Sequence, residues 1–311
     1  MIKYILLILI FVSCSLEFSD DKESWDKGTI NNENAISISH DGLNREYVLH
    51  VPETYNADES VPLVFNLHGG SGTATGQRYF SEMDQVADSA GFIVVYPQGS
   101  FVNGYSYWNS MIATEGSKGT ADDVGFISIL IDEISSNYNI DLSKVYACGY
   151  SNGGDMAISL ACYLSDKISA VAPVSGLMSQ ESDSLCEPNQ TTGVFIINGT
   201  ADNERPYSGI NDYYLSVDNA LAYWSNYHLA DSVVIENFVD GNNNAIEFYT
   251  YMNQGGLSLL QHYKIIDGGH YWFDLSVNGK NLDHLIWHFF EKHDNDMNIY
   301  RENDHHIHQE S

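Results

Sequence analysis

The stretch "KVYACGYSNGGDMAISLACYL", residues 144–164, changes its pattern at Ser151. Before this serine the run is apolar, as in a buried strand, and after it the apolar residues recur with helical spacing. Ser151 stands between Gly149 and Gly153, which have no side chain that could clash in a tight strand-to-helix turn. The pattern predicts that the Ser151 hydroxyl is held above a sheet, at the N-terminal end of the following helix.

The rest of the chain repeats this alternation of buried strands and helices. Helix-period stretches cover residues 78–90, 123–137, 153–165, 216–228 and 281–292, and apolar blocks cover residues 61–70, 91–99, 144–151, 168–176, 193–202 and 258–270. Apolar strands that alternate with helices predict a mostly parallel sheet covered on both faces. Residues 36–52 alternate apolar and polar around Asp41-Gly42, which predicts an antiparallel hairpin at one edge. We expect an α/β fold in one domain, residues 35–293.

The composition fits one large globular domain with an acidic surface. The chain has 311 residues, of which 43% are hydrophobic, enough to bury a sizeable core. It carries 42 acidic residues against 13 Lys and Arg, a formal net charge of −29. Such a surface repels a phosphate backbone, so we expect no nucleic-acid partner.

The N-terminus has the layout of a secretory signal. One lysine precedes the apolar run of residues 4–12, which is too short to span a bilayer. Ser13 and Cys14 resemble a bacterial lipoprotein cleavage site, so residues 1–14 are predicted to be a signal segment and Cys14 the lipidated first residue of the mature protein. Simple cleavage is the alternative. We expect an exported protein of the cell envelope, lipid-anchored or secreted, whose contact with a membrane is through this anchor.

Both ends of the chain lack the pattern of a packed domain. The acidic, polar residues 15–34 predict a flexible tether, and residues 294–311 predict a disordered tail. The tail contains His305, His306 and His308, but without a second shell or a fixed backbone these histidines would form a weak metal site at best. We therefore predict no metal site there.

Three cysteines remain once Cys14 is set apart. Cys148, Cys162 and Cys186 are an odd number in an oxidising compartment, for which one disulfide and one free thiol is the simplest account. Cys148 lies in an apolar strand-like run and is expected to be a buried small hydrophobe, which leaves Cys162 and Cys186 as the pair. None of the short paired spacings of zinc sites is present.

A serine at neutral pH is a poor nucleophile unless a base takes its proton, and the base needs an orienting acid. Two downstream residues have the right order and placement for these tasks. Asp202 follows the buried run "GVFIINGTAD", and His270 follows "LLQHYKIIDGGH", each at a turn made by glycines. We predict a catalytic triad of Ser151, Asp202 and His270.

The remaining need is an oxyanion hole, because a tetrahedral intermediate carries a negative charge that requires prearranged N–H donors. The segment "FNLHGGSG", residues 65–72, ends an early strand, and its glycines let the backbone approach a reacting carbonyl. We assign the backbone N–H groups of Gly70 and Asn152. His68 lies upstream of the serine, out of order for the base, so we expect it to make a structural hydrogen bond.

Other polar residues fit structural roles better than chemical ones. His262 sits inside its strand. His284 and His288 share one face of the last helix at metal-ligand spacing, but half-exposed helical histidines are far more common than metal sites. Asp122 and Asp123 point about 100° apart as they enter a helix, so they cannot flank one bond. Helix capping and complementation of the helix dipole explain the two aspartates better.

A set of motifs occurs in consistent order over residues 40–290: "LHGGSG", "VVYPQG", "YWN", "ADDVGFISILIDEI", "VYACGYSNGG", "LAC", "NGTAD" with "PYSG", and "GGHYW". The set resembles the secreted polyhydroxybutyrate depolymerase and feruloyl esterase group, related to carbohydrate esterase family 1, within the α/β-hydrolase fold. The resemblance implies a serine ester hydrolase with the same triad and the Cys162–Cys186 bridge. It also suggests that Trp108 and Trp272 line the acyl pocket.

Two departures from the group's pattern leave the substrate open. Asn198 stands where the group commonly has histidine, and Phe273 stands where a proline often follows the tryptophan. We expect an esterase that needs no cofactor and whose partner is an ester substrate, either feruloyl or acetyl esters of plant polysaccharide or hydroxyalkanoate oligomers. The alternatives are a surface lipoprotein that binds a glycan or polymer without chemistry, and a peptidase with the same triad.

Overall fold

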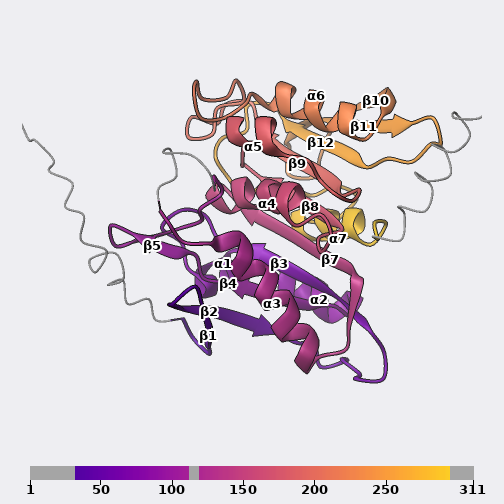
Figure 1. The fold of residues 1–311 in the computed structure, drawn as a ribbon. Coiled ribbons are helices and arrows are strands. Elements are labelled where there is room, and N and C mark those ends of the chain that lie inside the picture. Colours follow the sequence, from indigo (N-terminus) through magenta and orange to yellow (C-terminus); the bar gives the residue numbers. More distant parts are fainter. Residues whose placement is uncertain (1–31, 112–118, 295–311) are drawn as a thin grey trace, which may run out of the picture.

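The computed structural model describes residues 32–111 and 119–294 (Figure 1). In this part of the chain the strands are β1 (Ile36–His40), β2 (Leu43–His50), β3 (Val61–Leu67), β4 (Ile93–Pro97), β5 (Ser100–Val102), β6 (Tyr105–Tyr107), β7 (Ile140–Tyr150), β8 (Ala170–Val174), β9 (Gly193–Gly199), β10 (Ala230–Val239), β11 (Ala245–Asn253) and β12 (Leu260–Ile265). The helices there are α1 (Ala74–Phe80), α2 (Met83–Ala90), α3 (Asp123–Asn137), α4 (Asn152–Tyr163), α5 (Gln180–Leu185), α6 (Val217–Tyr227) and α7 (Leu282–Phe290).

One large sheet organises the described residues. Ten strands follow the order β1-β2-β4-β3-β7-β8-β9-β12-β11-β10 within this part of the chain. In this spatial order, the neighbouring strands β4-β3-β7-β8-β9-β12 pair in parallel. The β1–β2 hairpin adds to β4 in the antiparallel direction. The predicted mostly parallel sheet with an antiparallel N-terminal hairpin is therefore confirmed.

The far edge of the sheet differs from the prediction. Strands β10 and β11 form a second antiparallel pair beside β12. Neither strand belongs to the apolar blocks noted above. Strand β10 is exposed over most of its length, and most of β11 is only partly buried. An edge strand buries no face fully, so its sequence lacks the continuous apolar run that marks the central strands.

The predicted helix over residues 78–90 is wrong, since two short helices replace it. Helix α1 ends at Phe80, and Ser81 takes an extended conformation before α2 begins. The side-chain amide of Asn66 donates to Ser81 Oγ at 2.9 Å, which holds this break against strand β3. Helix α3 spans residues 123–137 as predicted, whereas α5 and the β5–β6 hairpin were not predicted.

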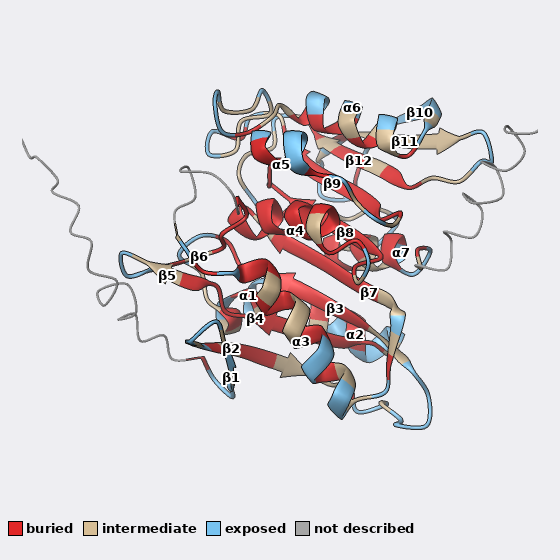
Figure 2. Ribbon diagram, in the orientation of Figure 1, coloured by how far each residue is buried: buried red, intermediate tan, exposed pale blue. Residues whose placement is uncertain are grey.

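Strand residues alternate between two hydrophobic cores, one on each face of the sheet. Leu63 and Phe65 of β3 pack in the same core as side chains of α3, α4 and α6, while Val64 packs with those of α2 and α7. The central strands and α4 are buried along most of their length (Figure 2). The helix that follows Ser151 is thus fixed within the core, which favours a precise position for the serine.

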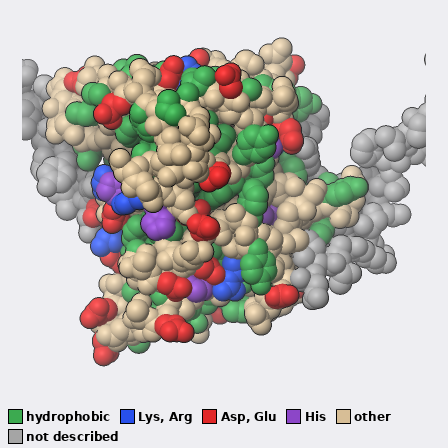
Figure 3. Space-filling view, turned by 180° about the vertical axis from the view of Figure 1, so that it is seen from behind, with side chains coloured by type: hydrophobic (Ala, Val, Ile, Leu, Met, Phe, Trp, Pro, Cys, Tyr) green, Lys and Arg blue, Asp and Glu red, His purple; other side chains and the backbone are tan. Residues whose placement is uncertain are grey.

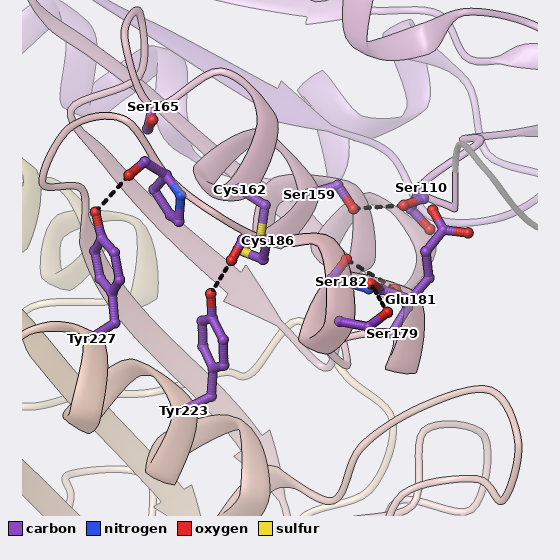
Figure 4. Close-up of a disulfide and its surroundings, with 12 residues drawn as sticks. Ser110, Ser159, Cys162, Ser165, Ser179, Glu181, Ser182, Cys186, Tyr223 and Tyr227 are labelled. Carbon is purple, nitrogen blue, oxygen red and sulfur yellow. Dashed lines mark hydrogen bonds between the residues drawn. A yellow bond between two sulfur atoms is a disulfide. The ribbon is translucent and has the colours of Figure 1, made fainter.

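A disulfide joins this buried helix to the segment after α5. Cys162 of α4 bonds to Cys186, and the hydroxyl of Tyr223 on α6 donates to the Cys186 carbonyl at 2.6 Å (Figure 4). Cys148 is a buried free thiol, and burial raises its pKa. The predicted pairing and the predicted place of Cys148 are both confirmed.

Several sequence predictions concern residues that the structure does not describe. The signal segment with Cys14, nearly all of the tether and nearly all of the tail lie outside the described residues. Within residues 32–111 and 119–294, no helix combines the length and the apolar character that crossing a bilayer requires.

Candidate active site

Ser151 occupies the tight turn between β7 and α4. Its φ of 53° and ψ of −118° fall in a region that side chains rarely adopt, and its N–H donates to the Val174 carbonyl at 2.9 Å. A Cβ atom at Gly149 would lie 2.3 Å from the Gly153 carbonyl oxygen, and one at Gly153 would lie 2.4 Å from that of Leu67. The two glycines are therefore required for close backbone approach, as the sequence predicted.

The structure brings the three predicted triad residues together. His270 Nε2 lies 2.8 Å from Ser151 Oγ, and His270 Nδ1 lies 2.7 Å from Asp202 Oδ2. Because a carboxylate only accepts, Nδ1–H donates to Asp202 and Nε2 is left to accept the serine proton. The Asp202 carboxylate is fully buried and the imidazole is 10% exposed.

Asp202 is held in its ionised form. Burial raises its pKa, but the hydrogen bond from His270 and the backbone N–H groups of Arg205 and Glu204 outweigh burial, so the pKa of Asp202 lies below its ordinary value. Both backbone N–H groups donate to Oδ1 at 2.8 Å, which leaves Oδ2 for the imidazole. The carboxylate is therefore both charged and correctly oriented towards His270.

The loop that carries His270 is tied to neighbouring strands. The hydroxyl of Tyr150, at the end of β7, donates to the His270 carbonyl at 2.9 Å, and Ser175 Oγ donates to the Tyr271 carbonyl at 2.8 Å. These bonds fix the histidine loop against β7, which carries the serine, and against the end of the neighbouring strand β8, so the distance between base and nucleophile depends little on loop motion.

The predicted oxyanion donors lie beside the serine. Gly70 and Asn152 line a cavity of about 460 Å³ together with Ser151. The Asn152 side chain makes two hydrogen bonds with the backbone of Trp108, accepting from its N–H at 2.7 Å and donating to its carbonyl at 3.0 Å. The backbone N–H of Asn152 is the first of α4, so no carbonyl within the helix accepts from it.

The two tryptophans do not occupy the predicted pocket. Trp108 is fully buried and its Nε1–H donates to the His68 carbonyl at 2.8 Å, so the prediction that it contacts substrate is wrong. Its role is to hold the segments beside the oxyanion donors. Trp272 does not line the cavity either; it is half-buried, donates to Asp283 Oδ2 at 3.2 Å and lies near the ring of Phe80.

The walls of the cavity come from segments that the sequence did not single out. Its other lining residues belong to the β5–β6 hairpin, the loop after Asp202 and the segment after β3: Ser71, Val102, Asn103, Tyr105, Tyr107, Glu204 and Arg205. Asn103 and Gly104 both have positive φ values at the hairpin turn. This Asn-Gly pair is a recognised turn signal, and it could have revealed the hairpin.

A buried ion pair links the acid loop to the nucleophile helix, and sequence reasoning missed it. Arg205 Nη2 lies 2.9 Å from Asp155 Oδ2, and the Asp155 side chain is fully buried. Burial lowers the pKa of Arg205, but the charge of Asp155 outweighs burial and raises it. Since Arg205 also donates its backbone N–H to Asp202, this pair couples the position of the acid to that of α4.

His68 makes the structural hydrogen bonds that were expected of it. Its Nε2 accepts from the Gly99 N–H at 2.9 Å, so the ring proton is on Nδ1, which donates to the Gly69 carbonyl at 2.7 Å. Burial lowers the pKa of His68 to about 4, which keeps the ring neutral near pH 7. The ring thereby helps to fix the glycine segment that follows β3.

The two neighbouring aspartates divide their roles. Asp122 caps α3 by accepting from the Gly125 N–H at 2.8 Å, as predicted. Asp123 does more than complement the helix dipole: it is fully buried, pairs with Arg45 at 2.6 Å and accepts from the Asn109 N–H at 2.7 Å. Burial raises the pKa of Asp123. Neither carboxylate lines the cavity at the serine.

The two histidines of the last helix form hydrogen bonds with different partners. His284 Nδ1 bonds to Asn281 Oδ1 at 2.6 Å, while His288 Nδ1 bonds to Glu291 Oε1 at 2.7 Å. In the described ranges, no three His, Cys, Asp or Glu side chains are grouped as metal ligands would be. His305, His306 and His308 lie outside those ranges.

A second hollow, of about 610 Å³, lies away from the serine. Residues of β10, β11, β12 and the segment 276–279 line it, and it shares no lining residue with the cavity at Ser151. The aromatic side chains of Phe238, Phe248 and Tyr263 form part of its lining.

Replacing Asp283 with asparagine is expected to stabilise the protein at alkaline pH. Burial raises the pKa of Asp283 from 3.8 to about 6, although the hydrogen bond from Trp272 lowers it. The ionised form is therefore disfavoured in the folded state, and wild-type stability falls as pH rises from 3.8 through about 6. We expect Asp283→Asn to raise the free energy of unfolding by about 2 kcal/mol at pH 8, a gain that vanishes near pH 4.

Urea denaturation of both proteins from pH 4 to 8 measures this difference. A stability gap that does not change across that range would contradict the raised pKa of Asp283.

The site and the sheet together define a class of protein. A serine at a strained turn after a central strand, with an acid and a histidine after later strands, is the arrangement of the α/β-hydrolase fold. A solved structure, the acetyl xylan esterase from Aspergillus awamori, superimposes with a TM-score of 0.54 at 18% identity, covering 76% of this chain and 93% of that one. The chain has the α/β-hydrolase fold.

A family model matches part of the sequence. Residues 45–192 match the family model described as Esterase PHB depolymerase. The matched part includes Gly70, Ser151 and Asn152 but ends before Asp202 and His270.

Curated relatives are esterases by name. A probable feruloyl esterase C from Aspergillus niger is 28% identical over 79% of this chain and 83% of its own length. A bifunctional acetylxylan esterase/xylanase from Neocallimastix patriciarum is 31% identical over 53% of this chain. The chain spans 23% of that protein, and it spans less than half the length of each of the first relatives that it matches.

Proposed function

We propose that the protein is a carboxylic ester hydrolase that works through an acyl-enzyme at Ser151. The observation that carries the proposal is the hydrogen-bonded array from Ser151 Oγ through His270 to Asp202, at 2.8 and 2.7 Å. The names of the relatives and the matched family model support the same reaction class.

Each step of the reaction has a residue to perform it. Ser151 Oγ attacks the ester carbonyl carbon while its proton moves to His270 Nε2, and the charged Asp202 stabilises the resulting imidazolium. The backbone N–H groups of Gly70 and Asn152 hold the oxyanion. His270 then gives its proton to the departing alkoxide as the C–O bond breaks. Water attacks the acyl-enzyme with His270 again as base, releasing the carboxylic acid and restoring Ser151.

We propose ester-linked substituents of plant polysaccharide as the substrates, in line with the acetylxylan and feruloyl esters in the relatives' names. Tyr105 and Tyr107 give the cavity at Ser151 aromatic walls suited to an acyl group. Hydroxyalkanoate oligomers, which the family description suggests, are the second candidate.

The two alternative functions have less support. A protein that only binds glycans has no physical need for a strained serine, an imidazole and a buried acid joined by hydrogen bonds. A peptidase would use the same three side chains, and faster turnover of a dipeptide than of an ester would favour it.

We further propose that the protein is exported and held at the cell envelope through Cys14. The support is the sequence of residues 1–14 alone. Metabolic labelling with a palmitate analogue, compared between the wild-type chain and Cys14→Ala, tests the anchor.

A panel of esters tests the substrate class. Purified protein is assayed with methyl ferulate, acetylated xylo-oligosaccharide and hydroxybutyrate trimer. We expect one polysaccharide-type ester to exceed the trimer by about 100-fold or more in kcat/KM, a difference of about 3 kcal/mol in transition-state binding. Preference for the trimer would reject the polysaccharide assignment while leaving the esterase mechanism intact.

A further inference from the structure

Beyond the cavity at Ser151, we propose that a partly exposed group of aromatic rings binds the neutral sugar chain that bears the ester. We name this group the aromatic platform: Phe80, Tyr150, Tyr271 and Trp272. The proposal rests on the proposed esterase function, since it concerns where the alcohol side of that substrate lies.

Three rings of the platform form a connected group beside His270, and Tyr271 directly follows that histidine in the chain. The ring of Phe80 lies 5.4 Å from that of Tyr150 and 6.5 Å from that of Trp272, and the Tyr150 ring lies 5.1 Å from the imidazole of His270. Phe80 is 52% exposed and Tyr271 is 63% exposed. Large aromatic side chains left in solvent next to a reactive group are expected where a partner covers them.

The glycine segment after β3 separates the platform from the cavity. A Cβ atom at Gly69 would lie 2.9 Å from the ring of Tyr150, whereas one at Gly70 would lie 3.8 Å from the ring of Tyr107. Tyr107 lines the cavity and Tyr150 does not. An ester held at the oxyanion donors therefore has an aromatic wall on each side. The cavity suits the acyl group, and the platform outside it suits the longer alcohol side.

The charges around the site favour a hydroxyl-rich partner. Glu204, 73% exposed, has Oε2 3.8 Å from His270 Nε2, and Asp267 is exposed on the histidine loop. Carboxylates only accept hydrogen bonds. Sugar hydroxyls can donate to them while the C–H face of the ring stacks on an aromatic side chain. The interior of a polyester chain offers carbonyl and ester oxygens and no hydrogen-bond donors. An anionic polymer would be repelled by a chain of net charge −29.

The wider surface has the same character. Figure 3 shows acidic side chains at many separate positions on one face, with few basic ones and several hydrophobic groups between them. A neutral chain can lie across such a surface without a charge penalty.

Single and double alanine variants at the two exposed platform positions test the proposal. The readout is the ratio of kcat/KM for acetylated xylohexaose to that for p-nitrophenyl acetate, whose alcohol is too small to follow the sugar path. We expect Phe80→Ala and Tyr271→Ala to lower this ratio about fivefold each and the double variant about 20-fold, through KM.

The neighbouring residue on the same helix provides the matched control. Tyr79 is 74% exposed, but its hydroxyl bonds to Glu33 at 3.1 Å. We expect Tyr79→Ala to leave the ratio within about twofold of wild type. An equal fall of both substrates in the platform variants would point to damage of the triad and overturn the proposal.

A binding measurement without turnover separates this proposal from the esterase function. In the Ser151→Ala background, migration through a gel containing acetylated xylan reports affinity for the chain alone. We expect retardation that Phe80→Ala and Tyr271→Ala together remove. If the double variant is still retarded, the sugar-binding assignment is wrong. It is also wrong if the platform variants lower kcat/KM for hydroxybutyrate trimer but not for acetylated xylohexaose. If the wild-type protein hydrolysed none of the esters, the esterase function itself would be rejected.

Discussion

Replacing Ser151 with alanine is expected to lower kcat for p-nitrophenyl acetate by at least about 10⁴-fold. The change removes the oxygen that would form the acyl-enzyme in the proposed mechanism, while the proposed oxyanion donors and base keep their positions. Alanine is smaller than serine, so the packed turn between β7 and α4 accommodates it. Steady-state assays on purified wild type and variant measure the loss.

The control is an exposed serine far from the chemistry. Ser89 lies on α2, and its hydroxyl bonds only to the carbonyl of Val86 among the interactions of the described residues. Ser89→Ala should retain wild-type turnover. Hydrolysis by Ser151→Ala within about tenfold of wild type would reject Ser151 as the nucleophile and with it the proposed mechanism.

Replacing Asp202 with asparagine is expected to lower kcat by about 10³- to 10⁴-fold. The backbone N–H groups of Glu204 and Arg205 need an acceptor, so the amide oxygen would take the place of Oδ1. The amide NH₂ would then face His270 Nδ1 and force that nitrogen to accept. The ring proton would move to Nε2, which could no longer take the proton of Ser151.

Asp267→Asn is the matched control, because it neutralises an exposed carboxylate on the histidine loop without touching the imidazole's partner. We expect its kcat for p-nitrophenyl acetate, which has no sugar chain to reach Asp267, to stay within about threefold of wild type. If both variants lost activity equally, the effect of Asp202 would be general electrostatics, and its role in setting the histidine tautomer would be wrong.

The candidate triad could be predicted because its sequence signals are local. Ser151, Asp202 and His270 each follow an apolar strand and sit at a turn made with glycines. Parallel strands end at one edge of a sheet, so residues placed after three such strands are brought close together by the fold class alone.

The surroundings of the triad were harder to predict because they depend on contacts between distant segments. Tryptophan is a common residue in pocket walls, yet Trp108 is fully buried. The β5–β6 hairpin before it packs against the glycine segment after β3, where the Ser71 N–H donates to the Ser106 carbonyl. The Arg205–Asp155 ion pair joins residues that are 50 positions apart. Strand β10 gave no strand signal because it lies at the sheet edge with little buried surface.

The sequence by itself predicted the central alternation of strands and helices, the tight turn at Ser151, the candidate acid Asp202 and base His270, and the disulfide pairing. These depend on periodicity, glycine placement and residue chemistry over a few neighbouring positions. Only the tertiary structure decided which aromatic rings are buried and which reach solvent, as Trp108 and Phe80 illustrate. Burial is a property of how whole elements pack, and one chain segment cannot specify what will cover it.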